Sequence, residues 1–165
     1  MRNLMLAAVV AVVACWGAAA AIAAPTGNFN QGQPHSCSFG GTNNDADLQS
    51  ESVTCTGTIS GLGNNPTPVF VVLVGPAGCS NPGNTDIPGQ RRFVSGPFTP
   101  DANGSVDYLA TGSVTCHGNQ VAFISSNLTL EAYACTSGRP RFDKTGAQTN
   151  SSCTLLDTRT ESVSP

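Results

Sequence analysis

Side chains with hard oxygen ligands alternate along one short stretch of the sequence: Asp101, Asn103, Ser105 and Asp107. Alternating carboxylate, amide and hydroxyl oxygens resemble the opening of a calcium-binding loop. The stretch lacks two further features of such a loop, because Val106 and Gly112 occupy the positions of its glycine and its final glutamate. Asn103 followed by glycine is also a strong signal for a hairpin turn. We therefore predict a turn here, with a calcium site as the alternative.

Paired carboxylates could instead hydrolyse a glycosidic bond, one as general acid and the other as nucleophile or base. The candidates are Glu51, Asp101, Asp107 and Glu131. Glu131 interrupts an apolar stretch, and strand alternation places it on an outer face. A solvated strand position accounts for it without catalysis. The one tryptophan, Trp16, lies in the apolar N-terminal run, so no tryptophan after that run can stack on a sugar ring.

Nucleophilic catalysis has little support in the sequence. The histidines are His35 and His117, and no G-x-S-x-G motif accompanies them. Cys116 precedes His117 directly, but adjacent residues on a strand point to opposite faces. We predict a protein that is not an enzyme and that uses no cofactor.

Six cysteines follow the N-terminal apolar run: Cys37, Cys55, Cys79, Cys116, Cys135 and Cys153. An even number in an exported chain indicates three disulfides. No C-x-x-C pair occurs, which removes the main support for a zinc ribbon or a thioredoxin-like site. Six cysteines allow fifteen connectivities, and the sequence does not select among them. Our working choice pairs neighbours in order, 37 with 55, 79 with 116 and 135 with 153.

The N-terminus predicts export. Residues 1–23 hold one positive charge, then an apolar run that ends in Ala-Ile-Ala. This order is typical of a secretory signal peptide. We expect a secreted or extracellular protein with no transmembrane segment in the mature chain. Cys15 offers an alternative, because the preceding Val-Val-Ala resembles a bacterial lipobox, and cleavage there would leave a lipid-anchored protein at the cell surface.

Beyond this run, short apolar segments alternate with Gly-, Pro- and Asn-rich turns, which is the rhythm of an all-β sandwich or barrel. The segment 69–74 is apolar on both faces, as a central strand would be. We predict an all-β fold, a single immunoglobulin-like β-sandwich held by disulfides. The predicted divisions are a signal peptide at 1–23, a flexible lead-in at 24–36, the sandwich domain at 37–156 and a polar tail at 157–165.

Several motifs resemble a family of exported bacterial proteins of unassigned function, most familiar from actinobacteria. They are TGTISGLGN (56–64), C-S-N-P-G (79–83), I-P-G-Q (87–90) and NLTLEAYAC (127–135). The resemblance covers about half of the chain and implies an exported β domain with paired cysteines, but no activity. More distantly, TPDANGSVDYLAT (99–111) is similar to a hairpin of bacterial immunoglobulin-like adhesin repeats.

Charge and loop composition guide the functional hypothesis. Charged residues are 10% of the chain and the formal net charge is −3, with no basic run that could follow a phosphate backbone, so nucleic acid is not an expected partner. The long loop 79–92 is the best candidate for recognition, because loops on a rigid scaffold often bind partners. Its candidate residues are Asn81, Asp86, Gln90, Arg91 and Arg92.

We therefore predict a secreted or cell-surface protein with a binding, adhesive or envelope-structural role and an unknown extracellular or cell-envelope ligand. One alternative is a small extracellular hydrolase with paired carboxylates. Another is a secreted inhibitor or effector that acts through loop 79–92. Three N-x-S/T sequons matter only in a eukaryotic source, and they begin at Asn103, Asn127 and Asn150.

Overall fold

The computed structural model describes residues 26–29, 33–40, 49–64, 67–81 and 89–164. The strands in these ranges are β1 (Asn28–Phe29), β2 (Ser36–Phe39), β3 (Ser50–Ser60), β4 (Val69–Ser80), β5 (Gly89–Phe98), β6 (Val106–Thr115), β7 (Val121–Ile124), β8 (Asn127–Cys135) and β9 (Cys153–Ser164). None of the described residues belongs to a helix long and apolar enough to cross a membrane. The predicted signal peptide and Cys15 lie outside the described residues.

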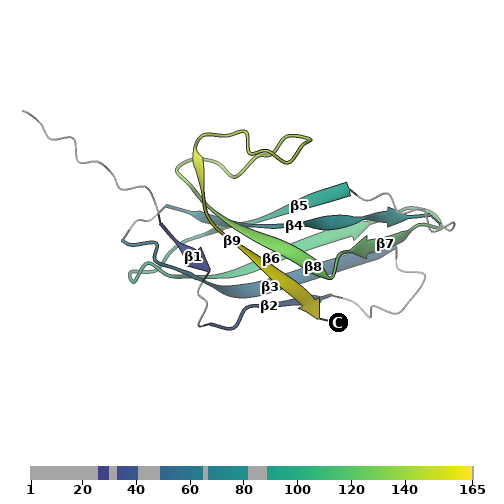
Figure 1. The fold of residues 1–165 in the computed structure, drawn as a ribbon, viewed down its shortest axis with the longest axis horizontal. Helices are drawn as coiled ribbons and strands as arrows, with labels where there is room; N and C mark the ends of the chain where they lie inside the picture. Colours follow the sequence, from purple (N-terminus) through teal and green to yellow (C-terminus); the bar gives the residue numbers. More distant parts are fainter. Residues whose placement is uncertain (1–25, 30–32, 41–48, 65–66, 82–88, 165) are drawn as a thin grey trace, which may run out of the picture.

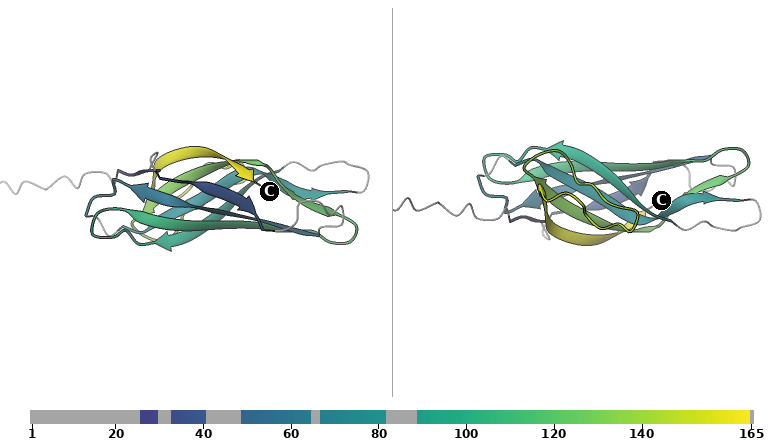
Figure 2. Two further views of the ribbon diagram at one scale, coloured as in Figure 1. Left: turned by 90° about the horizontal axis from the view of Figure 1, so that it is seen from below. Right: turned by 90° about the horizontal axis from the view of Figure 1, so that it is seen from above.

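The strands form two layers (Figure 1). In one layer, β3 pairs with β1 and β2 along one edge and with β6 along the other. In the second layer, β4 is central, with β5 on one edge, β8 and β7 on the other, and β9 beyond β8. All of these pairs are antiparallel, and one short parallel pairing between β2 and β9 joins the layers. Figure 2 shows that the molecule is elongated along its strands.

Alternation along the strands builds the core between the layers. Buried and exposed residues alternate over the whole of β6, and β3 contributes Val53 and Ile59, both fully buried. From the facing layer, β4 and β8 contribute Leu73 and Leu130 to the same hydrophobic cluster. The prediction of an all-β sandwich with disulfides is confirmed, whereas immunoglobulin-like connectivity stays a prediction.

The central strand β4 is buried on both faces. Its second face presents Phe70, Val72 and Val74 away from the main core. These side chains form a smaller cluster with Tyr133 and with Phe142, which belongs to the segment between β8 and β9. The segment therefore covers the outer face of this layer, and that cover explains why the sequence of β4 is apolar on both sides.

Three disulfides fasten the sandwich. Cys37 bonds Cys55, Cys79 bonds Cys116, and Cys135 bonds Cys153, with S–S distances of 2.00, 2.01 and 2.05 Å. These are the pairs of our working choice. The first joins paired residues of β2 and β3, and the third joins paired residues of β8 and β9. Cross-links of this loop length stabilise a domain by about 3 kcal/mol each in the chain-entropy model.

The two layers also meet along β5 and β6. The Ser95 hydroxyl accepts the backbone N–H of Thr111 at 3.0 Å and lies 3.4 Å from the carbonyl oxygen of the same residue, to which it donates. The serine side chain thereby satisfies backbone groups that an edge strand otherwise exposes.

Both ends of the domain differ from the sequence-based divisions. The predicted polar tail, 157–165, is the larger part of β9, which continues to Ser164 and pairs with β8 and β2. The predicted flexible lead-in, 24–36, contains β1, and Phe29 in that strand is buried and donates its N–H to the Asp157 carboxylate. Polar composition alone suggested a tail, but alternate residues of an antiparallel strand can be polar on the side that faces solvent.

Candidate functional site

A pocket of about 590 Å³ lies beside β5 and the segment 136–152, which the Cys135–Cys153 disulfide closes. In Figure 1 this segment lies over the outer face of the layer that contains β4 and β5. The pocket, called the arginine pocket below, is lined by Arg92, Val94, Arg139, Pro140, Arg141 and Phe142. Three of the seven Lys and Arg residues of the chain thus line one pocket of a protein whose formal net charge is negative.

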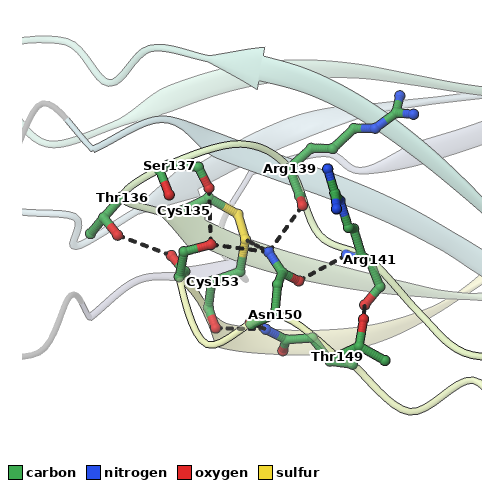
Figure 3. Close-up of a disulfide and its surroundings, with 10 residues drawn as sticks. Cys135, Thr136, Ser137, Arg139, Arg141, Thr149, Asn150 and Cys153 are labelled. Carbon is green, nitrogen blue, oxygen red and sulfur yellow. Dashed lines mark hydrogen bonds between the residues drawn. A yellow bond between two sulfur atoms is a disulfide. The ribbon is translucent and has the colours of Figure 1, made fainter.

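Asn150 fixes the backbone that holds two of these arginines (Figure 3). Its Oδ1 accepts the backbone N–H of Arg141 at 2.9 Å, and its Nδ2 donates to the carbonyl oxygen of Arg139 at 3.1 Å. The Arg141 carbonyl oxygen accepts the Thr149 N–H at 2.9 Å. Pro140, between the two arginines, is buried and has a restricted φ. The Arg-Pro-Arg backbone is therefore held on both sides.

The same amide anchors the segment to the disulfide. Asn150 Nδ2 lies 3.1 Å from Ser152 Oγ and 3.0 Å from Cys153 Sγ. The Ser152 hydroxyl in turn donates to the Ser137 carbonyl oxygen at 3.0 Å. Asn150 therefore connects the arginines to the covalent cross-link at the base of the segment.

The tip of the segment is a turn organised by Asp143. Its Oδ1 accepts hydrogen bonds from the Thr145 hydroxyl at 2.6 Å, the Thr145 N–H at 2.8 Å and the Ala147 N–H at 3.1 Å. The hydrogen bonds from Thr145 hold the pKa of the Asp143 carboxyl below its ordinary value. This carboxylate is therefore committed to the turn.

Arg92 is held from several sides. Its Nη1 contacts Glu131 Oε2 at 2.6 Å, in an ion pair whose side chains are 20% and 15% exposed. The guanidinium lies 4.6 Å from the centre of the Phe142 ring, within the range of a cation–π contact. Gly146, at φ +86°, brings the turn so close that an added Cβ would lie 3.1 Å from Arg92 Nε. The Arg92 head group is thus positioned and its charge is compensated.

Tyr133 completes the support beneath Arg92. Its hydroxyl donates to Glu131 Oε2 at 2.9 Å, and its ring meets Phe142 edge-on at a centroid distance of 5.7 Å. Burial, followed by the hydrogen bond to Glu131, raises the pKa of the Tyr133 hydroxyl. Tyr133 therefore stays protonated at neutral pH and keeps donating to the carboxylate.

Arg139 and Arg141 differ from Arg92 in their charge balance. Both are exposed, and Figure 3 shows the Arg139 side chain extending away from the disulfide. Among the described residues, the ion pairs are Arg92–Glu131 and Arg159–Glu161. The two guanidinium groups therefore have no carboxylate partner in that part of the chain. Guanidinium groups bind carboxylate and phosphate oxygens in a two-pronged geometry, so the pocket is chemically suited to an anion.

The predicted recognition loop is only partly represented at this site. Arg92 lines the pocket, but Gln90 and Arg91 are exposed residues of β5 outside its lining. Asn81 follows β4, and its Oδ1 accepts the Gln120 amide at 2.9 Å. Asp86 lies outside the described residues. The loop was expected to end in these two arginines, with a short strand beginning at Arg92, and the structure places both within β5.

The residues of the calcium alternative form a turn. Asp101 Oδ1 accepts the backbone N–H groups of Asn103 and Ser105 at 2.9 and 2.8 Å. Asp107 Oδ1 accepts the Thr58 hydroxyl at 2.6 Å. Asp101, Ser105 and Asp107 line a second pocket of about 360 Å³. In the described ranges, no group of three His, Cys, Asp or Glu residues is arranged to hold a metal ion.

The histidines lie apart from each other. His35 Nδ1 is 2.9 Å from the Tyr108 hydroxyl, and the rings of His35 and Tyr108 each contact the Phe29 ring edge-on. Burial, with Glu161 as a further contribution, raises the pKa of the Tyr108 hydroxyl. His117 is exposed in the turn after β6. The two histidines therefore lie in separate local environments.

Glu51 connects the two layers. Its Oε2 accepts the backbone N–H of Ile124 at 2.6 Å, which links β3 to β7. Burial raises the pKa of the Glu51 carboxyl above its ordinary value, and the hydrogen bond from Ile124 acts in the opposite direction. Glu51 and Glu131 are therefore both engaged in contacts between strands.

Sequence reasoning missed Arg139, Arg141 and Asn150 as site residues. A usable signal was present, because Arg-Pro-Arg lies inside the interval that Cys135 and Cys153 enclose. The disulfide constrains the backbone of the loop that carries this basic motif, and a constrained backbone holds the arginines in place for binding. Glu131 was expected on a solvated face, and the pairing with Arg92 was not foreseen because it depends on a contact across β4.

Comparisons with known proteins give little to set beside this geometry. No family model matches the chain, and no curated protein matches it. Among solved structures, the comparison finds a weak match to a Bordetella pertussis protein described as ApaA, with a TM-score of 0.33 and 10% sequence identity. The match covers 84% of this chain and 98% of the other. At that score the similarity supports no conclusion about fold or activity.

Proposed function

We propose that this chain is an exported, non-enzymatic β-sandwich protein that binds an anionic ligand at the arginine pocket. The observation that supports this most is the pair of exposed guanidinium groups, Arg139 and Arg141, on a backbone fixed by Asn150 and a disulfide. Because this backbone is already fixed before binding, less conformational entropy is lost when a ligand binds. The proposal therefore places recognition mainly on the segment 136–152, and Arg92 is the contribution from the predicted loop 79–92.

The binding test uses small anions and matched charge variants. We expect saturable chemical-shift changes at Arg139 and Arg141 when acetate or inorganic phosphate is titrated into the disulfide-bonded protein. R139Q/R141Q should weaken this binding by about 10-fold or more, as loss of a charge-assisted hydrogen bond does. The control R91Q/K144Q removes the same charge from residues outside the pocket lining and should change the affinity by less than about 2-fold.

Two outcomes would overturn the proposed binding site. One is the absence of saturable binding to either anion. The other is an equal loss of affinity in R139Q/R141Q and R91Q/K144Q, which would assign the effect to net charge.

The hydrolase alternative gains no support from Glu131, because Oε2 of that carboxylate already forms an ion pair with Arg92 and accepts a hydrogen bond from Tyr133.

Export is proposed on the predicted signal peptide together with the disulfides, which are typical of extracellular proteins. Intact mass of the protein from its native host, before and after reduction and alkylation, tests it. A chain that begins near Ala24, with six cysteines alkylated only after reduction, supports secretion. A lipid-sized mass excess on a chain that begins at Cys15 supports the lipid-anchored alternative, and a full-length chain with free thiols contradicts both.

A further inference from the structure

The side chains that line the arginine pocket offer hydrogen-bond donors and apolar surface but no acceptor. The polar members are all arginines, and a guanidinium group only donates. The remaining members are Val94, Pro140 and Phe142. Their neighbouring backbone carbonyl groups at Arg139 and Arg141 already accept hydrogen bonds from Asn150 and Thr149. The lining side chains therefore provide no hydrogen-bond acceptor for a ligand with several hydroxyl or N–H donors.

The pocket is larger than an inorganic anion. A pocket of about 590 Å³ falls in the range that holds organic ligands of small-drug size. An acetate or phosphate ion would fill a small fraction of it and leave the apolar walls in contact with water. A ligand that fills it must carry an uncharged body next to its anionic group.

The walls also favour a flat body. The Arg92 guanidinium, itself planar, lies over the Phe142 ring at 4.6 Å, and Tyr133 holds that ring edge-on. Both planar groups are therefore fixed in place. Planar guanidinium and aromatic surfaces attract aromatic rings through stacking and cation–π contacts.

We propose that the ligand class of the arginine pocket is an aromatic carboxylate: one carboxylate bound by Arg139 and Arg141, and an unsubstituted planar ring against Val94, Pro140 and Phe142. This inference rests on the proposed function, because it names the ligand of the same site. It specifies what the anion must be attached to, whereas the proposed function requires only the negative charge.

The test compares probes that separate charge, apolar size and planarity. The probes are acetate, 1-naphthoate, its neutral analogue 1-naphthamide, the saturated decahydro-1-naphthoate and glucuronate, each titrated into the disulfide-bonded protein. We expect 1-naphthoate to bind at least about 10-fold more tightly than acetate, because it buries an apolar ring. The amide should bind more weakly than the acid, and glucuronate should gain nothing over acetate because its hydroxyl donors find no acceptor side chain.

A ring variant adds a second, independent measurement. F142L removes the ring and keeps an apolar side chain, so it should lower the affinity for 1-naphthoate by a larger factor than the affinity for acetate. The matched control is F39L, because Phe39 packs against the other hydrophobic cluster. Retention of the native one-dimensional NMR spectrum in both variants confirms that the fold persists.

The possible failures are distinct. Equal affinities for acetate and 1-naphthoate, both lost in R139Q/R141Q, would overturn the aromatic assignment and leave anion binding intact. Equal affinities for 1-naphthoate and its saturated analogue would overturn the planar-ring requirement. Binding of glucuronate as tight as that of 1-naphthoate would identify the site as one for acidic sugars. Absence of binding to every anion would overturn the proposed function itself.

Discussion

Arg92 and Glu131 form an ion pair that passes over the central strand of their layer. Arg92 belongs to β5 and Glu131 to β8, and β4 lies between these strands. Their partners on β4 are Val74 and Val72, so the contact at 2.6 Å lies across the face that those valines occupy. The pair closes part of the outer hydrophobic cluster while it aims one guanidinium at the arginine pocket.

Removal of one charge from this pair should destabilise the fold. E131Q leaves the Arg92 guanidinium partly buried without its counter-charge, and we expect a loss of about 1–2 kcal/mol in the free energy of unfolding. A double-mutant cycle with R92Q, measured by urea unfolding, should give a coupling energy of about 1 kcal/mol. The reference cycle uses R159Q and E161Q on β9. Additive effects of R92Q and E131Q would contradict the structural role of the pair.

The two sequon asparagines Asn150 and Asn127 should respond differently to the same substitution. N150D keeps the acceptor for Arg141 but removes the donor to Arg139, Ser152 and Cys153, so we expect a loss of about 1–3 kcal/mol in thermal or urea unfolding. In N127D the retained Oδ1 still accepts the Ser162 hydroxyl. The change there should stay within about 0.5 kcal/mol. Similar losses in both variants would contradict the special role of Asn150.

Gly57 provides the space for the contact between His35 and Tyr108. An added Cβ would lie 2.7 Å from the Tyr108 hydroxyl and would also overlap the His35 imidazole. G57A should therefore lower the melting temperature, because overpacking of this kind costs about 1–3 kcal/mol. In an H35A background the same substitution should cost less, since the displaced ring is absent. A cost of equal size in both backgrounds, measured by differential scanning calorimetry, would show that His35 is not the obstacle.

Glu51 should give the stability of the protein a specific pH dependence. Burial raises the pKa of its carboxyl in the folded state, so the folded chain binds this proton more tightly than the unfolded chain does. Stability from this group is complete below the unfolded pKa of about 4.3 and is lost as pH rises through the folded pKa. E51Q should remove that loss, so the wild type should fall relative to E51Q as pH increases from about 4. Urea unfolding across a pH series measures the free energy of unfolding of both proteins. If the value for the wild type minus that for E51Q stayed constant or rose with pH, the assignment would be contradicted.

The strands could be predicted from the sequence because their signals are local. Apolar and polar residues alternate in SVTCTGTI (52–59), and VFVVLV (69–74) is apolar on both faces. Each pattern is typical of a strand, and the structure has β3 and β4 at these positions. The disulfides match our working choice, but the sequence itself did not select that pairing among the fifteen possible ones. The C-terminal strand was predicted only as far as residue 156. The rest of β9 was not predicted, because it is polar and is ordered by pairing with β8, a long-range contact that composition does not encode.

The arginine pocket could not be predicted in the same way. Arg92 lies 47 positions before Arg139 in the chain, as their numbers show, and the two meet only because the segment 136–152 folds back over β4 and β5. Phe142 was not recognised as a packing residue because it stands alone among polar neighbours. Its role depends on Tyr133 and Arg92, which come from two other strands.

The contact between Ser95 and Thr111 has a consequence for how the protein behaves at high concentration. Unpaired strand edges are templates on which other chains can add as strands, and many proteins prevent this with charged side chains. Charged residues make up only 10% of this chain. Here the β5 and β6 edges turn toward each other and one hydroxyl bonds both backbone groups of Thr111. Resistance to aggregation in this domain therefore depends at that seam on self-closure and not on electrostatic repulsion.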